Sequence, residues 1–411
     1  MTVVWGERLA GRLAGMKASE IRELLKVIER PEIISFAGGI PDPALFPHAE
    51  IAAAYRRVLE SNSLRSVALQ YSVSEGWLPL REFICDLQNQ AHAGSGTHIG
   101  ATPDTVMITS GSQQGLEFIG KLLIGAGDLV AVTRPTYLGA LQAFAPYEPR
   151  YVSVPVDDEG VLPDALEEAF KQNPKFFYLV PDFQNPNGIT TSLARRRAII
   201  TLADRYGIPV IEDAAYTELR YDGEALPSLL ALDAELSGPG EGFRPRNVLY
   251  AGTFSKTVAP ALRVGWLTGP AEVIHKLVLM KQAGDLHSST INQIVLNEVV
   301  REIWPALTAA LRAAYRVRRD AMLAALERWF PPGTRWTRPA GGLFVWLELP
   351  EGVDGTRLLE RAINEVNVAF VPGSAFHADR SGANTCRLSF SMVGPETIDE
   401  GIRRLSTLLP R

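Results

Sequence analysis

The chain has 411 residues, of which 46% are hydrophobic and 21% charged, an ordinary balance for a globular enzyme with a large core. Its length predicts two or three lobes, and its formal net charge of -5 argues against broad binding to nucleic acid or an anionic membrane. Cys85 and Cys386 give neither a disulfide framework nor a metal-ligand spacing, which favours a reducing compartment. No stretch has the form of a signal peptide or the length of a membrane span, so we expect a cytoplasmic protein without a metal site.

The first forty residues combine an amphipathic segment with a glycine pair. Ser19 is a candidate N-cap for a helix over residues 19–28. Gly38 and Gly39 precede Pro41 in a loop where the backbone can approach a ligand closely. A tight turn explains the pair equally well, and from these residues alone it is the preferred interpretation.

A strand, a turn of small residues and a helix follow one another between residues 105 and 124. The predicted strand covers residues 105–109, the predicted helix covers 116–124, and Ser112 and Gln113 lie between them. Free backbone N–H groups and the helix dipole make such a helix start an anion site. Because small residues are common in such turns, the pattern is consistent with a phosphate without establishing one.

Strands and helices then alternate. Strands are predicted over residues 129–133, 151–156, 176–180 and 209–212, and helices over 162–172 and 193–206. This alternation predicts an α/β fold with a mostly parallel sheet covered on both faces, in which ligands bind beyond the carboxyl ends of the strands. Asn185, Asp213 and Tyr216 all follow predicted strands and therefore gather at that edge.

Lys256 lies between two further predicted strands, over residues 247–251 and 263–267. Thr253 and Ser255 precede it, and Arg263 follows it. A lysine whose pKa is lowered by burial or nearby cations forms Schiff bases, whereas hydroxyls and a guanidinium suit a phosphate dianion. Together these groups indicate pyridoxal phosphate; a surface turn with a solvated lysine and arginine is the plain alternative. Four polar clusters at one edge of one sheet favour the cofactor.

Several side chains suit that chemistry, and each has a structural alternative. Asp213 could keep a pyridine nitrogen protonated or simply cap a helix. Asn185 and Tyr216 could donate to the ring oxygen, although Asn185 also suits an ordinary turn. Tyr137 could stack on the ring or pack in the core. Lys256 would be the base for a 1,3-proton shift.

The chain becomes helical after Pro270 and ends in a smaller lobe from about residue 305. We predict helices over residues 271–282, 290–303, 307–330 and 395–409, and antiparallel strands over 341–347, 368–371 and 386–390. Arg387 lies in an otherwise apolar strand, where it must find an anion or lose free energy through burial. A substrate carboxylate is one such partner, and a structural Asp or Glu is the other.

At this point the whole chain resembles the fold-type I, class I/II pyridoxal-phosphate aminotransferases. It is most similar to the branch that holds 2-aminoadipate aminotransferase of lysine biosynthesis and kynurenine/aminoadipate aminotransferase. The matching stretches run from end to end in the family's order: ASEIREL (18–24), SFAGG (35–39), LQYS (69–72), TSGSQQ (109–114), QNP (184–186), EDAAY (212–216), GTFSK (252–256) and CRLSF (386–390).

The resemblance implies a large domain with a mostly parallel seven-stranded sheet between helices and a smaller α+β domain. Residues 1–48 would form an N-terminal arm and part of the small domain, 49–304 the large cofactor-binding domain, and 305–411 the small C-terminal domain. It also implies a homodimer with active sites at the subunit interface.

The resemblance also implies roles for individual residues. Lys256 would be the Schiff-base lysine, Asp213 the partner of the ring nitrogen, and Tyr216 and Asn185 the partners of the ring oxygen. The phosphate would be held by Ser112, Gln113, Thr253, Ser255 and Arg263, with Tyr71 arriving from the other subunit, and Tyr137 would stack on the ring. Arg387 would bind the substrate α-carboxylate, Gly39 would line the substrate pocket, and Arg22 would be a mobile arginine able to pair with an acidic side chain.

Two positions depart from the family pattern. Asn187 stands where the family usually has Thr, in a turn whose shape tolerates it. Asp213 is followed by two alanines rather than by a second acidic residue, which bears on side-chain preference and not on the cofactor.

The expected function is a ping-pong aminotransferase that acts on L-2-aminoadipate and glutamate, with leucine or aromatic amino acids as further candidates and 2-oxoglutarate as acceptor. A lyase on the same fold, catalysing β-elimination or decarboxylation, is the first alternative, because fold does not fix the reaction. An Arg for the α-carboxylate together with Arg22 favours transamination. A transcription regulator on this fold is the second alternative; the match begins by about residue 16, which leaves no room for a DNA-binding domain, and the chain is acidic.

Overall fold

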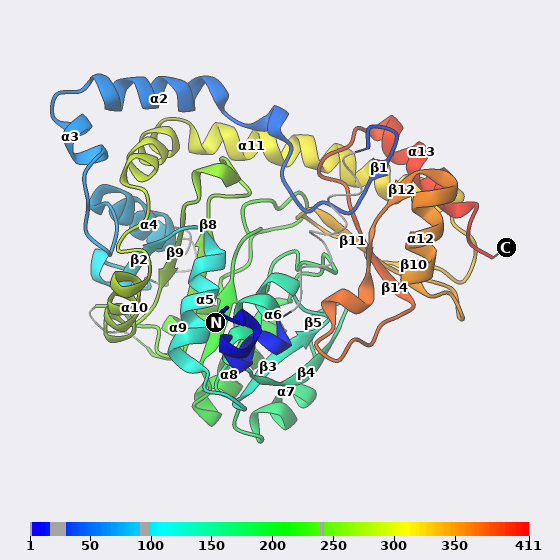
Figure 1. Cartoon of the computed structure of the whole chain (residues 1–411), viewed down its shortest axis with the longest axis horizontal. Helices are drawn as coiled ribbons and strands as arrows, with labels where there is room; N and C mark the ends of the chain where they lie inside the picture. Colours follow the sequence, from blue (N-terminus) through cyan, green and yellow to red (C-terminus); the bar gives the residue numbers. More distant parts are fainter. Residues whose placement is uncertain (1, 17–29, 91–97, 239, 241, 411) are drawn as a thin grey trace.

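A computed structural model describes residues 2–16, 30–90, 98–238, 240 and 242–410, and its largest element is a sheet (Figure 1). Within these residues the sheet has eight strands, in the order β2 (Val106–Thr109), β9 (Gly265–Thr268), β8 (Val248–Thr253), β7 (Val210–Asp213), β6 (Phe177–Leu179), β3 (Leu129–Arg134), β4 (Arg150–Asp157) and β5 (Gly160–Val161). The pairs from β8 to β4 are parallel, whereas β9 is antiparallel to both its neighbours and β5 is antiparallel to β4. The mostly parallel sheet is thus confirmed.

The sheet has one strand more than the seven that the resemblance implies, and the additional strand is β5. β5 is only two residues long and returns beside β4 after a turn. Gly160 has φ +101°, a conformation that favours glycine, and this lets the chain reverse within two residues. The short hairpin extends the sheet at its edge without altering the order of the other strands.

Helices cover the sheet and connect its strands (Figure 1). Their bounds are α2 (His48–Glu60), α3 (Leu64–Ala68), α4 (Leu78–Gln90), α5 (Ser112–Leu123), α6 (Leu138–Phe144), α7 (Pro163–Phe170), α8 (Leu193–Tyr206), α9 (Leu229–Leu236) and α10 (Ala271–Gly284). Short 3-10 turns occur at η1 (Trp5–Arg8), η2 (Gly11–Gly15), η3 (Pro43–Leu45), η5 (Pro103–Thr105), η6 (Ala145–Tyr147), η7 (Pro260–Leu262) and η8 (Gly373–Phe376). None of the described helices is long and apolar enough to cross a membrane.

The helices predicted over residues 290–303 and 307–330 are one helix, so that prediction was wrong. α11 (Thr290–Trp329) runs for 40 residues with Pro305 inside it. Packing on both sides of the proline explains why it does not end the helix: Val299 and Val300 before it and Leu311 and Tyr315 after it are buried, and α11 packs against α2 and α13 (Pro395–Ser406). Ion pairs with these two helices add to the contacts, at 2.9 Å between Arg57 and Glu298 and at 3.0 Å between Arg328 and Asp399. Tertiary contacts can thus outweigh the hydrogen bond that proline removes.

The smaller lobe holds a four-stranded antiparallel sheet, in the order β10 (Arg335–Trp336), β11 (Phe344–Glu348), β14 (Thr385–Ser389) and β13 (Val371–Pro372), together with α12 (Gly355–Val366) and α13. The strand predicted over residues 368–371 is divided, because β12 (Val368–Ala369) instead pairs in parallel with β1 (Ile34–Ser35). Residues near the N-terminus therefore belong beside the C-terminal lobe. Position 305 lies inside α11, and the expected domain boundaries stay a prediction.

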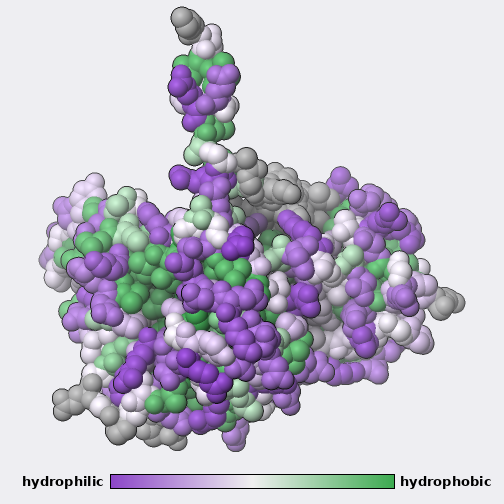
Figure 2. All heavy atoms as spheres, turned by 90° about the horizontal axis from the view of Figure 1, so that it is seen from below, coloured by the Kyte–Doolittle hydropathy of each residue, from purple (hydrophilic) through white to green (hydrophobic). Residues whose placement is uncertain are grey.

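The N-terminal residues stand away from the rest of the protein. Figure 2 shows a narrow arm that projects from the body, and residues 2–13, which include η1, are exposed. Trp5 is 73% exposed, although large aromatic residues are normally covered.

Candidate functional site

A cavity of about 130 Å³ lies at the carboxyl ends of β6, β7 and β8, beside the start of α5. The residues that line it include every predicted cofactor residue except Tyr71: Ser112, Gln113, Tyr137, Asn185, Asp213, Tyr216, Thr253, Ser255, Lys256 and Arg263. Val180, Ala215 and Pro260 complete the wall. Residues far apart in the sequence thus meet at one edge of the sheet.

Lys256 presents its amine to this cavity. The amine donates a hydrogen bond to the carbonyl oxygen of Gly39 at 3.2 Å. Burial, followed by the positive charge of Arg387, lowers the pKa of Lys256 to about 8, while Asp213 opposes this and Arg263 adds to it. A pKa in this range leaves an appreciable neutral fraction near neutral pH, as a nucleophilic or basic amine requires.

Asp213 is buried at the end of β7 and has one unpartnered oxygen. Its Oδ2 accepts a hydrogen bond from the hydroxyl of Tyr178 at 2.8 Å, whereas Oδ1 has no partner among the described residues. Burial raises the pKa of Asp213 to about 6, although Tyr178 and Lys256 both lower it. An orphaned carboxylate oxygen in a buried site needs a donor, and a protonated ring nitrogen is such a donor. Here the residues present fit the expected cofactor.

The preceding residue on β7, Glu212, has a different role. It accepts hydrogen bonds from the backbone N–H groups of Leu229 and Leu230, at 3.0 and 2.9 Å, and so caps α9. Successive strand side chains point to opposite faces of a sheet. The helix-capping carboxylate is therefore Glu212, and Asp213 is left for the cavity.

The start of α5 forms a cradle with the chain around Arg263. Arg263 Nη2 donates to the carbonyl oxygen of Ser110 at 3.0 Å. Thr253 Oγ1 donates to Ser255 Oγ at 2.9 Å and accepts from the Ser255 N–H at 3.1 Å. A helix N-terminus, two hydroxyls and a guanidinium lining one cavity are a donor set suited to a phosphate dianion.

Arg387 is fully buried on β14, and its partners are all neutral. It donates to Asn185 Oδ1 at 2.8 Å and to the carbonyl oxygen of Ala37 at 2.6 Å, while Nε has no partner among the described residues. Its guanidinium lies 4.4 Å from the ring centre of Phe344 and 5.0 Å from that of Phe376. Burial lowers the pKa of Arg387 to about 10. No Asp or Glu among the described residues pairs with it, so the structural acidic partner considered for this arginine is not found in that part of the chain.

Asn185 connects Arg387 to Tyr216. Its Nδ2 donates to the Tyr216 hydroxyl at 3.4 Å, while its Oδ1 accepts from Arg387. Gly39 lies on the other side, where an added Cβ would sit 2.8 Å from Cζ of Phe344, the ring beneath Arg387. The glycine therefore leaves room for the ring that supports the guanidinium.

Of the remaining predicted site residues, Arg387 and Gly39 do not line the cavity but adjoin it through their hydrogen bonds to Asn185 and Lys256, whereas Tyr71 lies apart from it. Tyr71 is 79% exposed and makes an edge contact with His287, with ring centres 6.0 Å apart. Arg22 falls within residues 17–29, outside the described residues.

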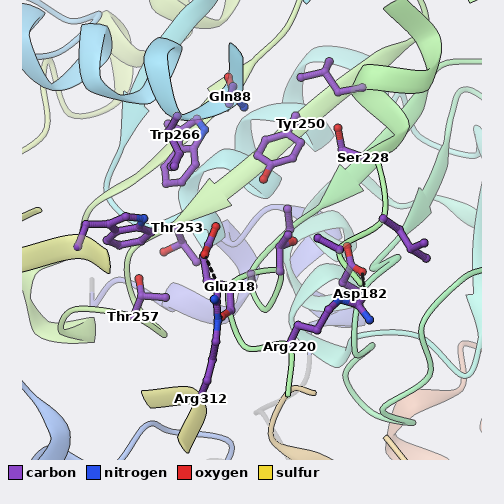
Figure 3. Close-up of a pocket in the computed structure, with 18 of the residues that line it drawn as sticks. Gln88, Asp182, Glu218, Arg220, Ser228, Tyr250, Thr253, Thr257, Trp266 and Arg312 are labelled. Atoms are coloured by element: carbon purple, nitrogen blue, oxygen red, sulfur yellow. Dashed lines mark hydrogen bonds and ion pairs between the residues drawn. The ribbon is translucent and has the colours of Figure 1, made fainter. Parts of the chain in front are cut away.

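A second cavity, of about 380 Å³, shares Ala215 and Thr253 with the first (Figure 3). Arg312 of α11 reaches Glu218 there at 2.9 Å, and Tyr250 and Trp266 stack on neighbouring strands with ring centres 6.3 Å apart. No motif in the sequence marks this cavity, because its lining comes from several separate elements. Tyr178 was also missed, and the only signal for it was a hydroxyl within an apolar strand.

Comparison with known proteins identifies the family. The sequence model of the family described as Aminotransferase class I and II matches residues 34–405. The chain is 43% identical over 406 residues to the 2-aminoadipate transaminase of Thermus thermophilus, a match that covers 98% of this chain and 97% of that protein. It is 41% identical over 412 residues to aromatic-amino-acid aminotransferase 1 of Thermococcus litoralis, which covers 98% of this chain and 94% of that one.

A solved structure agrees with these relatives. The crystal structure of alpha-aminoadipate aminotransferase from Thermus thermophilus, complexed with N-(5'-phosphopyridoxyl)-L-leucine, superposes with a TM-score of 0.89 at 42% identity. The match covers 99% of this chain and 98% of that one. The fold class, the enzyme class and the cofactor expected from the sequence are thereby confirmed. The chain belongs to the class I and II aminotransferases of fold type I, and its cofactor is pyridoxal 5'-phosphate.

Proposed function

We propose that this aminotransferase moves the α-amino group of L-2-aminoadipate or L-glutamate to a 2-oxo acid such as 2-oxoglutarate, in two successive half-reactions. Leucine and aromatic amino acids are further candidate donors, since one relative is named for aminoadipate and another for aromatic amino acids. The observation that carries the proposal is Arg387, a buried cation with neutral partners and a free Nε, joined through Asn185 to the cofactor cavity.

When bound, pyridoxal phosphate supplies the electron sink that stabilises negative charge at the substrate Cα. Lys256 would take the Cα proton on its amine and deliver it to the cofactor carbon that receives the amino group, a role that its lowered pKa suits. Asp213 would keep the ring nitrogen protonated through Oδ1, and Tyr216 and Asn185 would bind the ring oxygen. Tyr137 would stack on the ring. The remaining cofactor residues would hold the phosphate: Ser112, Gln113, Thr253, Ser255 and Arg263.

The substrate is held at both ends. Arg387 binds the α-carboxylate, for which its planar fork offers two parallel hydrogen bonds. Gly39 leaves room beside that carboxylate. Arg22 pairs with the distal carboxylate of an acidic substrate, a role that rests on its position in the matched ASEIREL stretch.

The active unit in this proposal is a homodimer in the cytoplasm, in which Tyr71 of the second subunit completes the phosphate site. Tyr71 is exposed in the single chain, and so are its apolar neighbours Leu69 and Val73, at 71% and 54%. Neighbouring apolar side chains exposed on a monomer are typical of a protein interface. The free, buried thiols of Cys85 and Cys386 accord with a reducing compartment.

The proposal is tested by half-reactions. The enzyme loaded with pyridoxal phosphate is mixed separately with L-2-aminoadipate, L-glutamate, L-leucine, L-phenylalanine and L-kynurenine, and conversion of the cofactor to its amine form is followed by absorbance. We expect the largest rate constant with aminoadipate or glutamate, and recovery of the aldehyde form on adding 2-oxoglutarate. Fast conversion with leucine or phenylalanine alone would contradict the acidic substrate, and steady release of carbon dioxide without conversion would indicate a decarboxylating lyase.

A further inference from the structure

Tyr178 occupies the centre of the large sheet, directly behind the residue that faces the cofactor. It lies on β6, paired with Val132 of β3 and Ile211 of β7, and is completely buried. The two residues before it in the chain, Phe176 and Phe177, are equally buried without any hydroxyl. A buried hydroxyl lowers stability unless it finds a partner, and the partner here is Asp213.

The hydrogen bond has a fixed direction. A tyrosine hydroxyl carries one proton, and an ionised carboxylate only accepts, so Tyr178 is the donor in the 2.8 Å contact with Asp213 Oδ2. Burial and the charge of Asp213 raise the pKa of Tyr178 well above its ordinary value, so the hydroxyl keeps its proton across the working range of pH. With Oδ2 occupied, Oδ1 is the oxygen left without a partner.

We propose that Tyr178 is a positioning residue for the transamination, because its hydroxyl holds Asp213 ionised and leaves Oδ1 free to accept a hydrogen bond from the protonated nitrogen of the cofactor. This inference rests on the role proposed above for Asp213. A hydrogen bond to the charged form of an acid lowers its pKa, and here it opposes the desolvation that raises it.

The other ionisable groups around Asp213 do not replace this hydroxyl. Lys256 acts through its charge and also lowers the pKa of Asp213, but its charge changes during the reaction because its amine takes up and gives back a proton. Tyr216 and Tyr250 are close enough for Asp213 to raise their pKa values, and neither donates to its carboxylate. The nearby backbone N–H of Ala215 also lowers the pKa of Asp213, but it is a main-chain group and leaves Oδ1 without a hydrogen-bond partner among the described residues. Tyr178 is therefore the donating side chain that remains in place through the reaction.

The test compares Tyr178→Phe with Tyr151→Phe. Tyr151 lies on β4, and its buried hydroxyl has no partner among the described residues, so its loss controls for removing a buried oxygen from the same sheet. In Tyr178→Phe we expect the acid limb of kcat/KM against pH to move up by about one pH unit, with activity recovered above it. We also expect the dissociation constant of pyridoxal phosphate, measured by equilibrium dialysis at neutral pH, to rise about tenfold. Tyr151→Phe should change neither.

A double-substitution cycle separates this inference from the proposed function. In an Asp213→Asn background, Tyr178→Phe should add nothing to the loss of cofactor affinity, since both act through one carboxylate. An unchanged acid limb, or a loss of rate equal at every pH, would overturn the role of Tyr178 while Asp213→Asn still impairs the enzyme. If Asp213→Asn itself binds the cofactor and turns over normally, the proposed role of Asp213 fails and this inference falls with it.

Discussion

The backbone of Gly111 lies against the guanidinium of Arg263, so closely that a Cβ added at residue 111 would sit 2.8 Å from Arg263 Cζ. Gly111 also has φ +78°, in the region that disfavours side chains. Both the backbone conformation and the space occupied by Arg263 therefore favour glycine at residue 111, beside the predicted phosphate site.

The first prediction follows from that contact. Gly111→Ala should displace Arg263 from the start of α5 and raise the dissociation constant of pyridoxal phosphate about tenfold or more, equivalent to a lost charge-assisted hydrogen bond. Gly127→Ala is the matched control, because Gly127 has φ +83° but open space around its Cβ position. Both variants should lose similar thermal stability, and only Gly111→Ala should lose cofactor. Equal cofactor affinity in the two would show that the contact does not matter.

Two buried arginines should respond in opposite ways to replacement by methionine. Arg196 is fully buried and binds Asp182 at 2.6 Å, whereas Arg387 is fully buried with neutral partners. Replacing Arg196 removes one of the two arginines that neutralise Asp182, since Arg220 also binds it at 3.1 Å, and takes the donor away from the carbonyl oxygens of Thr191 and Pro227. Arg196→Met should therefore lower the Tm of the apoprotein strongly, while Arg387→Met should leave the Tm unchanged or raise it. A large drop in Tm for Arg387→Met would mean that this arginine serves the fold.

The activity of Arg387 variants tests its proposed role directly. Arg387→Lys keeps the charge but loses the planar fork, so kcat/KM for glutamate should fall about 100-fold, corresponding to roughly 2 to 3 kcal/mol. Cofactor affinity, measured by dialysis, should stay close to that of the unsubstituted enzyme. Unchanged kcat/KM would assign the α-carboxylate to another group.

The pKa of Lys256 predicts a pH-dependent difference in stability. The folded protein holds this pKa near 8, below the ordinary value of 10.5, so below pH 8 folding must bury a charged amine that the unfolded chain keeps in water. This cost is fully present below pH 8 and disappears as the pH rises toward 10.5. Urea unfolding of apoprotein should therefore show Lys256→Met as the more stable protein at pH 7, with a margin that shrinks by pH 10. A margin independent of pH would contradict the lowered pKa.

The dimeric site can be tested by complementation. Tyr71→Ala and Lys256→Ala should each impair turnover, and co-expressed chains should form hybrid dimers in which one of two sites has both residues intact. Activity restored in the hybrid would support a site shared between subunits. If Tyr71 serves its own chain, the hybrid should be no more active than the mean of the two parents.

The sequence predicted those features whose signals are local. α8 has its predicted bounds because Ser192 caps its start, accepting from Arg195 N at 3.4 Å, and Gly207 ends it in a left-handed conformation. Asp354 gives a similar signal for α12, with bonds to the N–H groups of Thr356 and Arg357, yet our sequence analysis named no helix there. The predicted ends of the strands were also sufficient to predict that the cofactor residues lie together at one edge of the sheet.

Features that depend on tertiary contacts were not predictable in this way. The split prediction for α11 arose because a proline is visible in the sequence, whereas the packing of α2 and α13 is not. The hydrogen-bond partners of Arg387 could not be predicted for the same reason, since neither Asn185 nor Ala37 is near it in the chain. Tyr178 was missed because an alternating strand pattern gives the face of a side chain and not its hydrogen-bond partner.

The unbroken course of α11 determines how the two lobes can move. A loop between the two lobes would allow the smaller lobe to change its orientation freely. A continuous helix that is bound to α2 at one end and to α13 at the other instead resists such a change. Any displacement of the smaller lobe must bend α11, and a helix bends most easily where a backbone hydrogen bond is already missing. Pro305 is that point, so the smaller lobe should rock about a hinge near residue 305 while each half of the helix keeps its own contacts.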